Sequence, residues 1–399
     1  MLLGFLFLCT GCGAGPITFD GSAYPRRSGE TRALVLWVRF ADDVKSADAP
    51  VTAAARAWAQ PDRLPGQASS LVSASSRHPT GLTEYFQSQS GGRFSLTGAS
   101  FPVVLVSEEN EVAYKKSDGT LDQGKLTREL LRKVDASGRL HLDDFDADRD
   151  GFVDYVFVII RAMKSTRLYP THASGVSDLG YTSEGPEFGR RSRLQVSRHA
   201  SGSYVRYDNA GNIFPETDLV RLLAHEIGHD IWTENVHLLP VAPLPGIPSF
   251  PDYQIGSALM SGRSDARGDE TISAAERDWA GWITCTALAR DTTFVVRDLY
   301  SSQADNCFTM DVPQPGAYTS ARTLYLSHRA RIGPFDRLLT EHAKQARRDQ
   351  GLMDTGLLVM AAETGGRLGP VPADGKLTLS ATAEAYAGDL FRSGDRLTP

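Results

Sequence analysis

Two histidines and a glutamate near the middle of the chain have the spacing of a zinc site. His225, Glu226 and His229 form an H-E-x-x-H motif. On a helix, residues i and i+4 lie one turn apart on one face, so both imidazoles can bind one Zn²⁺ ion, and the glutamate reaches the water on it. Zinc lowers the pKa of its bound water to about 7, and Glu226 can take the proton as the hydroxide attacks a peptide carbonyl. The motif therefore predicts peptide hydrolysis with Glu226 as the general base.

A second group of acidic residues has the pattern of a cation-binding loop. Aspartates stand at every second position, at Asp146, Asp148 and Asp150, and a glycine at position 151 and a fourth aspartate, Asp154, follow. Ca²⁺ takes 6–8 oxygen ligands, and this pattern matches the first nine positions of an EF-hand loop. Phe157 stands at the twelfth position, where an EF-hand has its closing acid. The loop therefore predicts a structural calcium site of another kind, and a solvated acidic turn is the alternative.

Residues 215–232, which carry the histidines, have the pattern of a buried helix. Pro215 suits the first turn, and Thr217 or Asp218 can cap it. Apolar residues then recur at helical spacing: Leu219, Leu222, Leu223, Ile227 and Ile231. A helix that buries this stripe holds both imidazoles on a rigid support.

The residues before this helix predict alternating strands and helices. Residues 33–40 are apolar at nearly every position, which is typical of a strand buried on both faces. The other patterns predict strands at residues 94–98, 103–106 and 155–160, and helices at residues 51–58, 82–90 and 125–134.

The order of these motifs resembles that of the immune-inhibitor-A-like secreted zinc metallopeptidases, a family of the wider metzincin-like group. The resemblance covers residues 31–365 and includes the first strand, residues 82–94, the Asp-rich loop, the H-E-x-x-H helix, a turn at 258–262, a helix at 272–282, and strands at 324–329 and 356–359. It implies an α+β zincin-like catalytic fold that cleaves protein or peptide substrates. It also implies that Met260 is the methionine of a Met-turn, packed beneath the metal.

The segment after the helix departs from the family's pattern. Related enzymes have a glycine three residues after the second histidine and the third zinc ligand three residues further on, where this chain has Trp232 and Asn235. An amide is a weak zinc donor, so we expect the third ligand to be His237, then Glu234, with Asn235 last. A catalytically inactive surface-binding protein with the same fold is the alternative function.

The N-terminal residues have the pattern of an export signal. The apolar run at residues 2–8 is too short to span a membrane and resembles a signal-peptide core. Residues 8–12 resemble a bacterial lipoprotein signal, in which Cys12 would be lipidated. We therefore expect a signal peptide over residues 1–12, a tether over residues 13–30, and an extracellular or outer-surface location with membrane attachment through Cys12. A buried N-terminal strand is the alternative.

Export would place Cys285 and Cys307 in an oxidising compartment. A disulfide between them would stabilise the fold by about 3 kcal/mol. A pair of free core thiols is the alternative.

Length and charge limit the remaining possibilities. The chain has 399 residues, 42 Lys and Arg against 48 Asp and Glu, and a net charge of −6. This balance provides no basic face for nucleic acid, and we expect a monomer. The length predicts two or three domains. The motifs above indicate a catalytic domain over residues 31–287. From about Leu288 the pattern changes to short strands, at 293–296 and 323–326, and a basic helix at 339–348, which predicts a β-rich domain, such as a sandwich, over residues 288–399.

Overall fold

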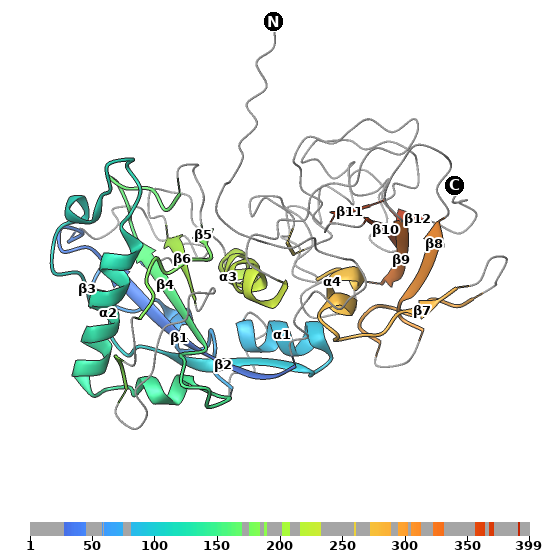
Figure 1. Cartoon of the computed structure of the whole chain (residues 1–399), viewed down its shortest axis with the longest axis horizontal. Helices are drawn as coiled ribbons and strands as arrows, with labels where there is room; N and C mark the ends of the chain where they lie inside the picture. The colour runs from blue at the N-terminus through green and yellow to red at the C-terminus, as the bar shows by residue number, and fades with distance from the viewer. Residues whose placement is uncertain are drawn as a thin grey trace, which may run out of the picture.

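The computed structural model contains two β-sheets, with helices packed between them and on the outer face of the first (Figure 1). The residues that it describes are 28–44, 58, 60–74, 81–169, 175–183, 187–189, 202–207, 216–232, 259–260, 272–288, 294–301, 305–312, 322–330, 356–363, 367–370 and 390–391. The expectations for Cys12 and for the helix at residues 339–348 concern residues outside this set, as do the predicted helix at residues 51–58 apart from Trp58 and the predicted tether apart from residues 28–30. The first strand starts at Gly29, so the last residues of the predicted tether belong to the fold.

The first sheet is mixed and mostly parallel. Its strands are β1 (Gly29–Arg39), β2 (Phe94–Ser100), β3 (Leu105–Val106), β4 (Tyr155–Arg161), β5 (Gly175–Val176) and β6 (Gly202–Tyr207). Their order is β2-β1-β4-β6-β5, and β3 also pairs with β1. Only β5 is antiparallel to its neighbour, and among the described strands it forms one edge of the sheet.

Helices cover both faces of this sheet, which explains its apolar strands. On one face, Leu34 and Leu36 pack with the apolar side of α2 (Gln123–Ser137). On the other face, Val35 and Trp37 belong to the same apolar cluster as α1 (Leu82–Ser90) and α3 (Glu216–Trp232). A strand buried on both faces needs apolar residues at every position, as predicted for residues 33–40.

Short helices complete the N-terminal part. Three 3₁₀ helices are formed by Gly66–Ser69, Glu111–Tyr114 and Leu142–Phe145. Helix α1 ends at Gly91, whose φ of 61° is the left-handed conformation that glycine adopts readily at a helix C-terminus. Asp122 caps α2 by accepting a hydrogen bond from the backbone N–H of Lys125.

Helix α3 lies between the two sheets (Figure 1). The predicted apolar stripe is buried: Leu219, Leu222, Leu223, Ile227 and Ile231. No helix in the described part of the chain is both long and apolar enough to cross a membrane.

The second sheet is mostly antiparallel and lies in the C-terminal part. Its strands are β7 (Thr286–Ala287), β8 (Phe308–Val312), β9 (Arg322–Arg329), β10 (Gly356–Glu363), β11 (Arg367–Pro370) and β12 (Leu390–Phe391), in the order β11-β10-β9-β8-β7, with β12 also pairing with β10. Tyr325 and Met360 join the cluster that contains α3. The apolar core is therefore continuous across residue 288, and the domain boundary there stays a prediction.

The predicted β-rich character of this part is confirmed, but one predicted strand is wrong. Residues 294–297 form no strand, although Phe294 and Val296 alternate with the exposed Val295. Their side chains pack on the small apolar cluster of β8, and the Phe294 and Phe308 rings lie 4.7 Å apart. An extended loop can thus bury alternate residues without strand pairing. The described C-terminal strands form one sheet, and the second layer of a sandwich is not among them.

Candidate active site and metal-binding loop

Helix α3 brings the two predicted zinc ligands together. The ring centroids of His225 and His229 are 5.1 Å apart, with the ring planes at 88°. Both side chains are buried although they are polar. The two imidazoles therefore lie side by side on one face of a helix that has little freedom to move.

A backbone carbonyl orients the first imidazole. The Nδ1 atom of His225 lies 2.8 Å from the carbonyl oxygen of Leu259. Because a carbonyl can only accept, Nδ1 must carry the proton, and Nε2 is then the basic nitrogen. In this tautomer a histidine can bind a metal through Nε2, and such a carbonyl contact is typical of metal-binding histidines.

Met260 packs directly against the helix between the two histidines. It is fully buried, and a Cβ atom added to Gly228 would lie only 2.3 Å from its Sδ atom. The missing side chain at Gly228 therefore allows the thioether to touch the backbone of α3. Met260 thus packs against the histidine-bearing helix, and its role as the methionine of a Met-turn stays a prediction.

Glu276, which the sequence analysis did not single out, holds this turn in place. Its carboxylate accepts backbone hydrogen bonds from Met260 at 2.8 Å, Leu259 at 3.1 Å and Ser273 at 2.8 Å. Glu276 also forms a capping box with Ser273 at the start of α4 (Ala274–Trp279). Burial raises the pKa of the Glu276 carboxyl, and the hydrogen bonds from Met260, Ser273 and Leu259 oppose that shift. The S-x-x-E pattern at residues 273–276 is the sequence signal that could have identified it.

The carboxylate of Glu226 lies against the edge of the first sheet. Helix α3 contacts β5, and the Glu226 Oε1 atom occupies the space that a side chain at Gly175 would fill. Burial raises the pKa of Glu226 to about 8. A carboxylate with a raised pKa is a stronger base, which suits the role predicted for Glu226. No local sequence pattern marks Gly175.

The described residues supply two of the nitrogen ligands that a zinc ion needs. The candidates for the third ligand, His237, Glu234 and Asn235, lie outside the described residues. Two neighbouring imidazoles, one held in the metal-binding tautomer, fit a zinc ion in donor type and placement. Within the described part, only the Asp-rich loop brings together three or more candidate ligand side chains.

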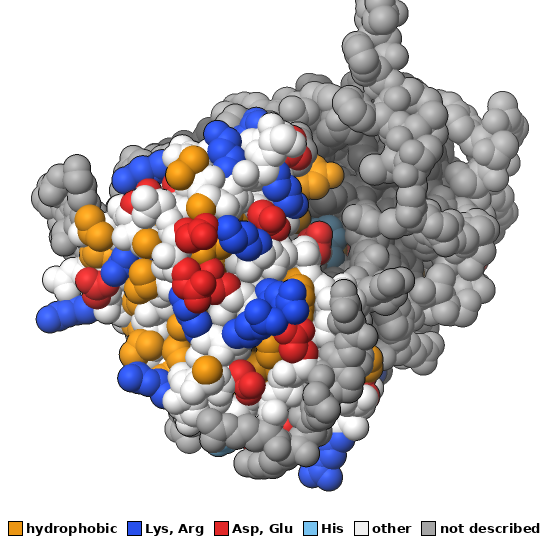
Figure 2. Space-filling view, turned by 60° about the vertical axis from the view of Figure 1, so that its left-hand side comes forward, with side chains coloured by type: hydrophobic (Ala, Val, Ile, Leu, Met, Phe, Trp, Pro, Cys, Tyr) orange, Lys and Arg blue, Asp and Glu red, His pale blue; other side chains and the backbone are white. Residues whose placement is uncertain are grey.

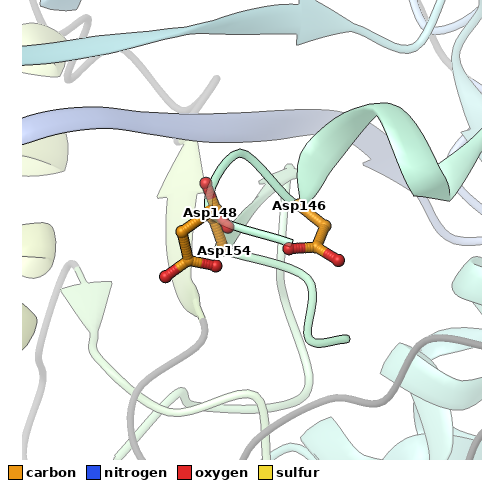
Figure 3. A group of neighbouring side chains, drawn as sticks. All are labelled: Asp146, Asp148 and Asp154. Atoms are coloured by element: carbon orange, nitrogen blue, oxygen red, sulfur yellow. The ribbon is translucent and has the colours of Figure 1, made fainter. Parts of the chain in front are cut away.

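The Asp-rich loop gathers three carboxylates in one place. Oxygen atoms of Asp146, Asp148 and Asp154 all lie within 4.8 Å of one another (Figure 3). The fourth predicted ligand, Asp150, is not in this group, and its Oδ1 accepts a hydrogen bond from the backbone N–H of Phe152. Three clustered carboxylates repel one another, so a cation between them would relieve the repulsion.

Asp154 connects the loop to the sheet. Its carboxylate accepts hydrogen bonds from the backbone N–H groups of Arg32 on β1 and of Ala147. Burial raises its pKa to about 6 against these hydrogen bonds, and the negative charges of Asp148 and Asp146 raise it further. A partly buried carboxylate that resists ionisation in this way gains from a bound cation.

A groove of about 810 Å³ runs along α2, on the face of the first sheet opposite to α3. Acidic and basic side chains intermingle on this side of the molecule (Figure 2). Lys125 pairs with Glu109, and both Arg128 and Arg132 pair with Glu187. The groove therefore presents paired charges rather than a field of one sign.

Cys285 and Cys307 form a disulfide. It ties the segment after α4 to the residue before β8, beside the helix that carries Glu276.

No protein-family model matches this sequence, and no curated protein is significantly similar to it. The resemblance to the zinc metallopeptidases therefore depends on the motifs and on the geometry around α3.

Proposed function

We propose that this protein is an exported zinc-dependent metallopeptidase that hydrolyses peptide bonds in proteins. The observation that carries the proposal is the arrangement on α3. Two neighbouring imidazoles, one oriented by the carbonyl of Leu259, and a buried carboxylate lie on a helix against which Met260 packs. A zincin-like catalytic fold is part of this proposal.

His225 and His229 would hold the zinc ion together with His237 or Glu234. When bound, the ion supplies the Lewis acidity that activates water and polarises the peptide carbonyl. Glu226 accepts the proton of the attacking water and returns it to the leaving amine. Burial of Glu226 favours both steps, because the proton affinity of a desolvated carboxylate lies close to neutral pH.

Met260 and Glu276 support this site rather than take part in the reaction. Glu276 fixes the backbone of Leu259 and Met260, and Leu259 in turn fixes the ring of His225. Partners of this kind commonly change metal affinity 10–100-fold when they are removed.

A structural Ca²⁺ ion at Asp146, Asp148 and Asp154 is the second cofactor of the proposal. The proximity of the three carboxylates and the raised pKa of Asp154 support it. The disulfide supports export, since disulfides persist in oxidising compartments. Anchoring at the outer cell surface through a lipidated Cys12 completes the proposed location.

The zinc content of the purified protein tests this function. We expect close to one zinc ion per chain, its loss in His229→Ala, and chelator-sensitive cleavage of an unfolded casein-like substrate. Zinc content that is unchanged in His229→Ala would refute the metal site. Zinc without cleavage would instead favour the inactive surface-binding alternative.

A further inference from the structure

Gly175 has no side chain at the place where the Glu226 carboxylate lies. Gly175 begins β5, and a Cβ atom built on it would be 2.2 Å from Oε1, 2.7 Å from Cδ and 3.0 Å from Cγ of Glu226. The distances to Oε1 and Cδ are shorter than any that a real Cβ atom tolerates, and the distance to Cγ is shorter than an ordinary carbon contact of about 3.5–4.0 Å. Any other residue at this position would therefore collide with the carboxylate.

The backbone conformation does not explain why this position is a glycine. Gly175 is not among the residues with positive φ, whereas Gly180, further along the same segment, has a φ of 60°. An alanine could therefore adopt the backbone conformation of Gly175 without strain. The contact with Glu226 is the remaining steric reason for a glycine here.

The strand that carries Gly175 is held from two sides and cannot easily move away. Gly175 and Val176 pair with Val205 and Tyr204 of β6. The loop that follows β5 docks on α2, where a Cβ atom on Gly124 would lie 2.1 Å from the carbonyl oxygen of Gly180. The hydroxyl of Thr127 on α2 donates to the carbonyl of Leu179 in the same loop. A clash at position 175 must therefore be relieved mainly by movement of Glu226.

The Glu226 side chain has few alternative conformations. It is 4% exposed, and Glu226 lies on a helix packed against both β5 and β6. A carboxylate displaced from β5 must find another pocket in this packed region. The new position would misplace the atoms that accept the proton.

We propose that Gly175 is a positioning residue, whose missing side chain keeps the Glu226 carboxylate at the edge of the sheet in the geometry that proton transfer requires. The contact between Gly175 and Glu226 does not depend on the proposed function. The catalytic consequence of the contact rests on the proposed function. Gly175→Ala should fold, bind zinc, and place its general base wrongly.

A stability cycle on the full-length protein tests the contact without measuring activity. We expect Gly175→Ala to lower the melting temperature by a few degrees when Glu226 is present. In a Glu226→Ala background, which removes the colliding atoms, the same change should leave the melting temperature equal or higher. Equal losses in both backgrounds would overturn the proposal.

Gly66→Ala is the matched control for this cycle. Gly66 also lacks a positive φ, and a Cβ atom there would meet nothing within 4 Å. We expect this control to leave the melting temperature unchanged or slightly higher, because alanine restricts the unfolded chain. A loss equal to that of Gly175→Ala would show that the effect is not the contact with Glu226.

Kinetics test the catalytic consequence. We expect Gly175→Ala to keep its zinc and its KM and to lose about 100-fold in kcat, since a misplacement of about 1 Å can cost that much. Shortening the base by Glu226→Asp should cost less in the Gly175→Ala background than in the wild type. Full kcat in zinc-loaded Gly175→Ala would overturn the positioning role. A wild type without peptidase activity would refute the proposed function. The stability cycle would still show whether position 175 and Glu226 are in steric contact.

Discussion

Removal of the Glu276 carboxylate should destabilise the backbone of Leu259 and Met260, which contact the helix that carries the two histidines. Glu276 is 0% exposed and accepts three backbone hydrogen bonds, from Leu259, Met260 and Ser273. Each hydrogen bond to a charged group contributes about 1.5–3 kcal/mol, and a donor left buried without a partner costs about 1–3 kcal/mol. Because the turn can relax, we expect Glu276→Ala to cost about 3–5 kcal/mol, as for other buried charged partners.

The two oxygens of Glu276 allow a graded test. Oε1 accepts from Met260, whereas Oε2 accepts from both Leu259 and Ser273. A glutamine can keep its oxygen on the Oε2 side and lose only the bond to Met260, so Glu276→Gln should cost about 1–3 kcal/mol. With an unfolding entropy of about 2.1 cal/mol/K per residue, 1 kcal/mol corresponds to about 1.2 °C for a chain of 399 residues. The expected losses in Tm are therefore about 4–6 °C for alanine and about 1–4 °C for glutamine.

Thermal unfolding followed by circular dichroism, together with zinc titration, measures both consequences. Glu84→Ala is the matched control, because Glu84 is an acid in the first turn of α1 as Glu276 is in α4, but Glu84 is partly exposed whereas Glu276 is buried. Since Leu259 orients His225, zinc affinity should fall about 10–100-fold in Glu276→Ala and stay unchanged in the control. If Glu276→Ala unfolds no earlier than Glu84→Ala, or if glutamine costs as much as alanine, the reasoning is wrong.

Two further predictions concern the Asp-rich loop. Millimolar Ca²⁺ should raise the Tm of the wild type and of Asp150→Asn but not of Asp148→Asn, because Asp148 belongs to the group of three carboxylates and Asp150 does not. Equal shifts in the two variants would contradict this. In calcium-free protein, the pKa of Asp154 is about 6 in the folded state and 3.8 ordinarily, so the native state binds more protons between these two pH values. Asp154 should therefore stabilise the fold below pH 3.8 and lose that contribution as the pH rises through about 6. Denaturant unfolding of the wild type and Asp154→Asn checks this, and an identical pH dependence in the two proteins would refute it.

The elements with strong periodicity were predictable from the sequence. Residues 33–40 and 155–160 form the buried strands β1 and β4, and the apolar stripe of residues 215–232 forms α3. In each case, one or both faces must be buried, and the pattern of apolar residues records this requirement. The neighbouring placement of His225 and His229 follows directly from the helix.

The features that could not be predicted depend on contacts between distant segments. Gly175 is a glycine because of Glu226, which lies far away in the sequence, so no local pattern indicates it. Strand β5 has two residues and no apolar alternation. Glu276 differs, because its capping-box pattern was present, but its hydrogen bonds to Leu259 and Met260 require the folded chain.

The rate of peptide cleavage by Glu226→Gln, compared with the wild type at equal zinc content, tests the central claim most directly. Glutamine keeps the shape of the side chain but cannot accept the proton of the attacking water. The account predicts that the variant keeps its fold and its zinc and loses about 10²–10⁴-fold in kcat. Cleavage at the wild-type rate by zinc-loaded Glu226→Gln would contradict it.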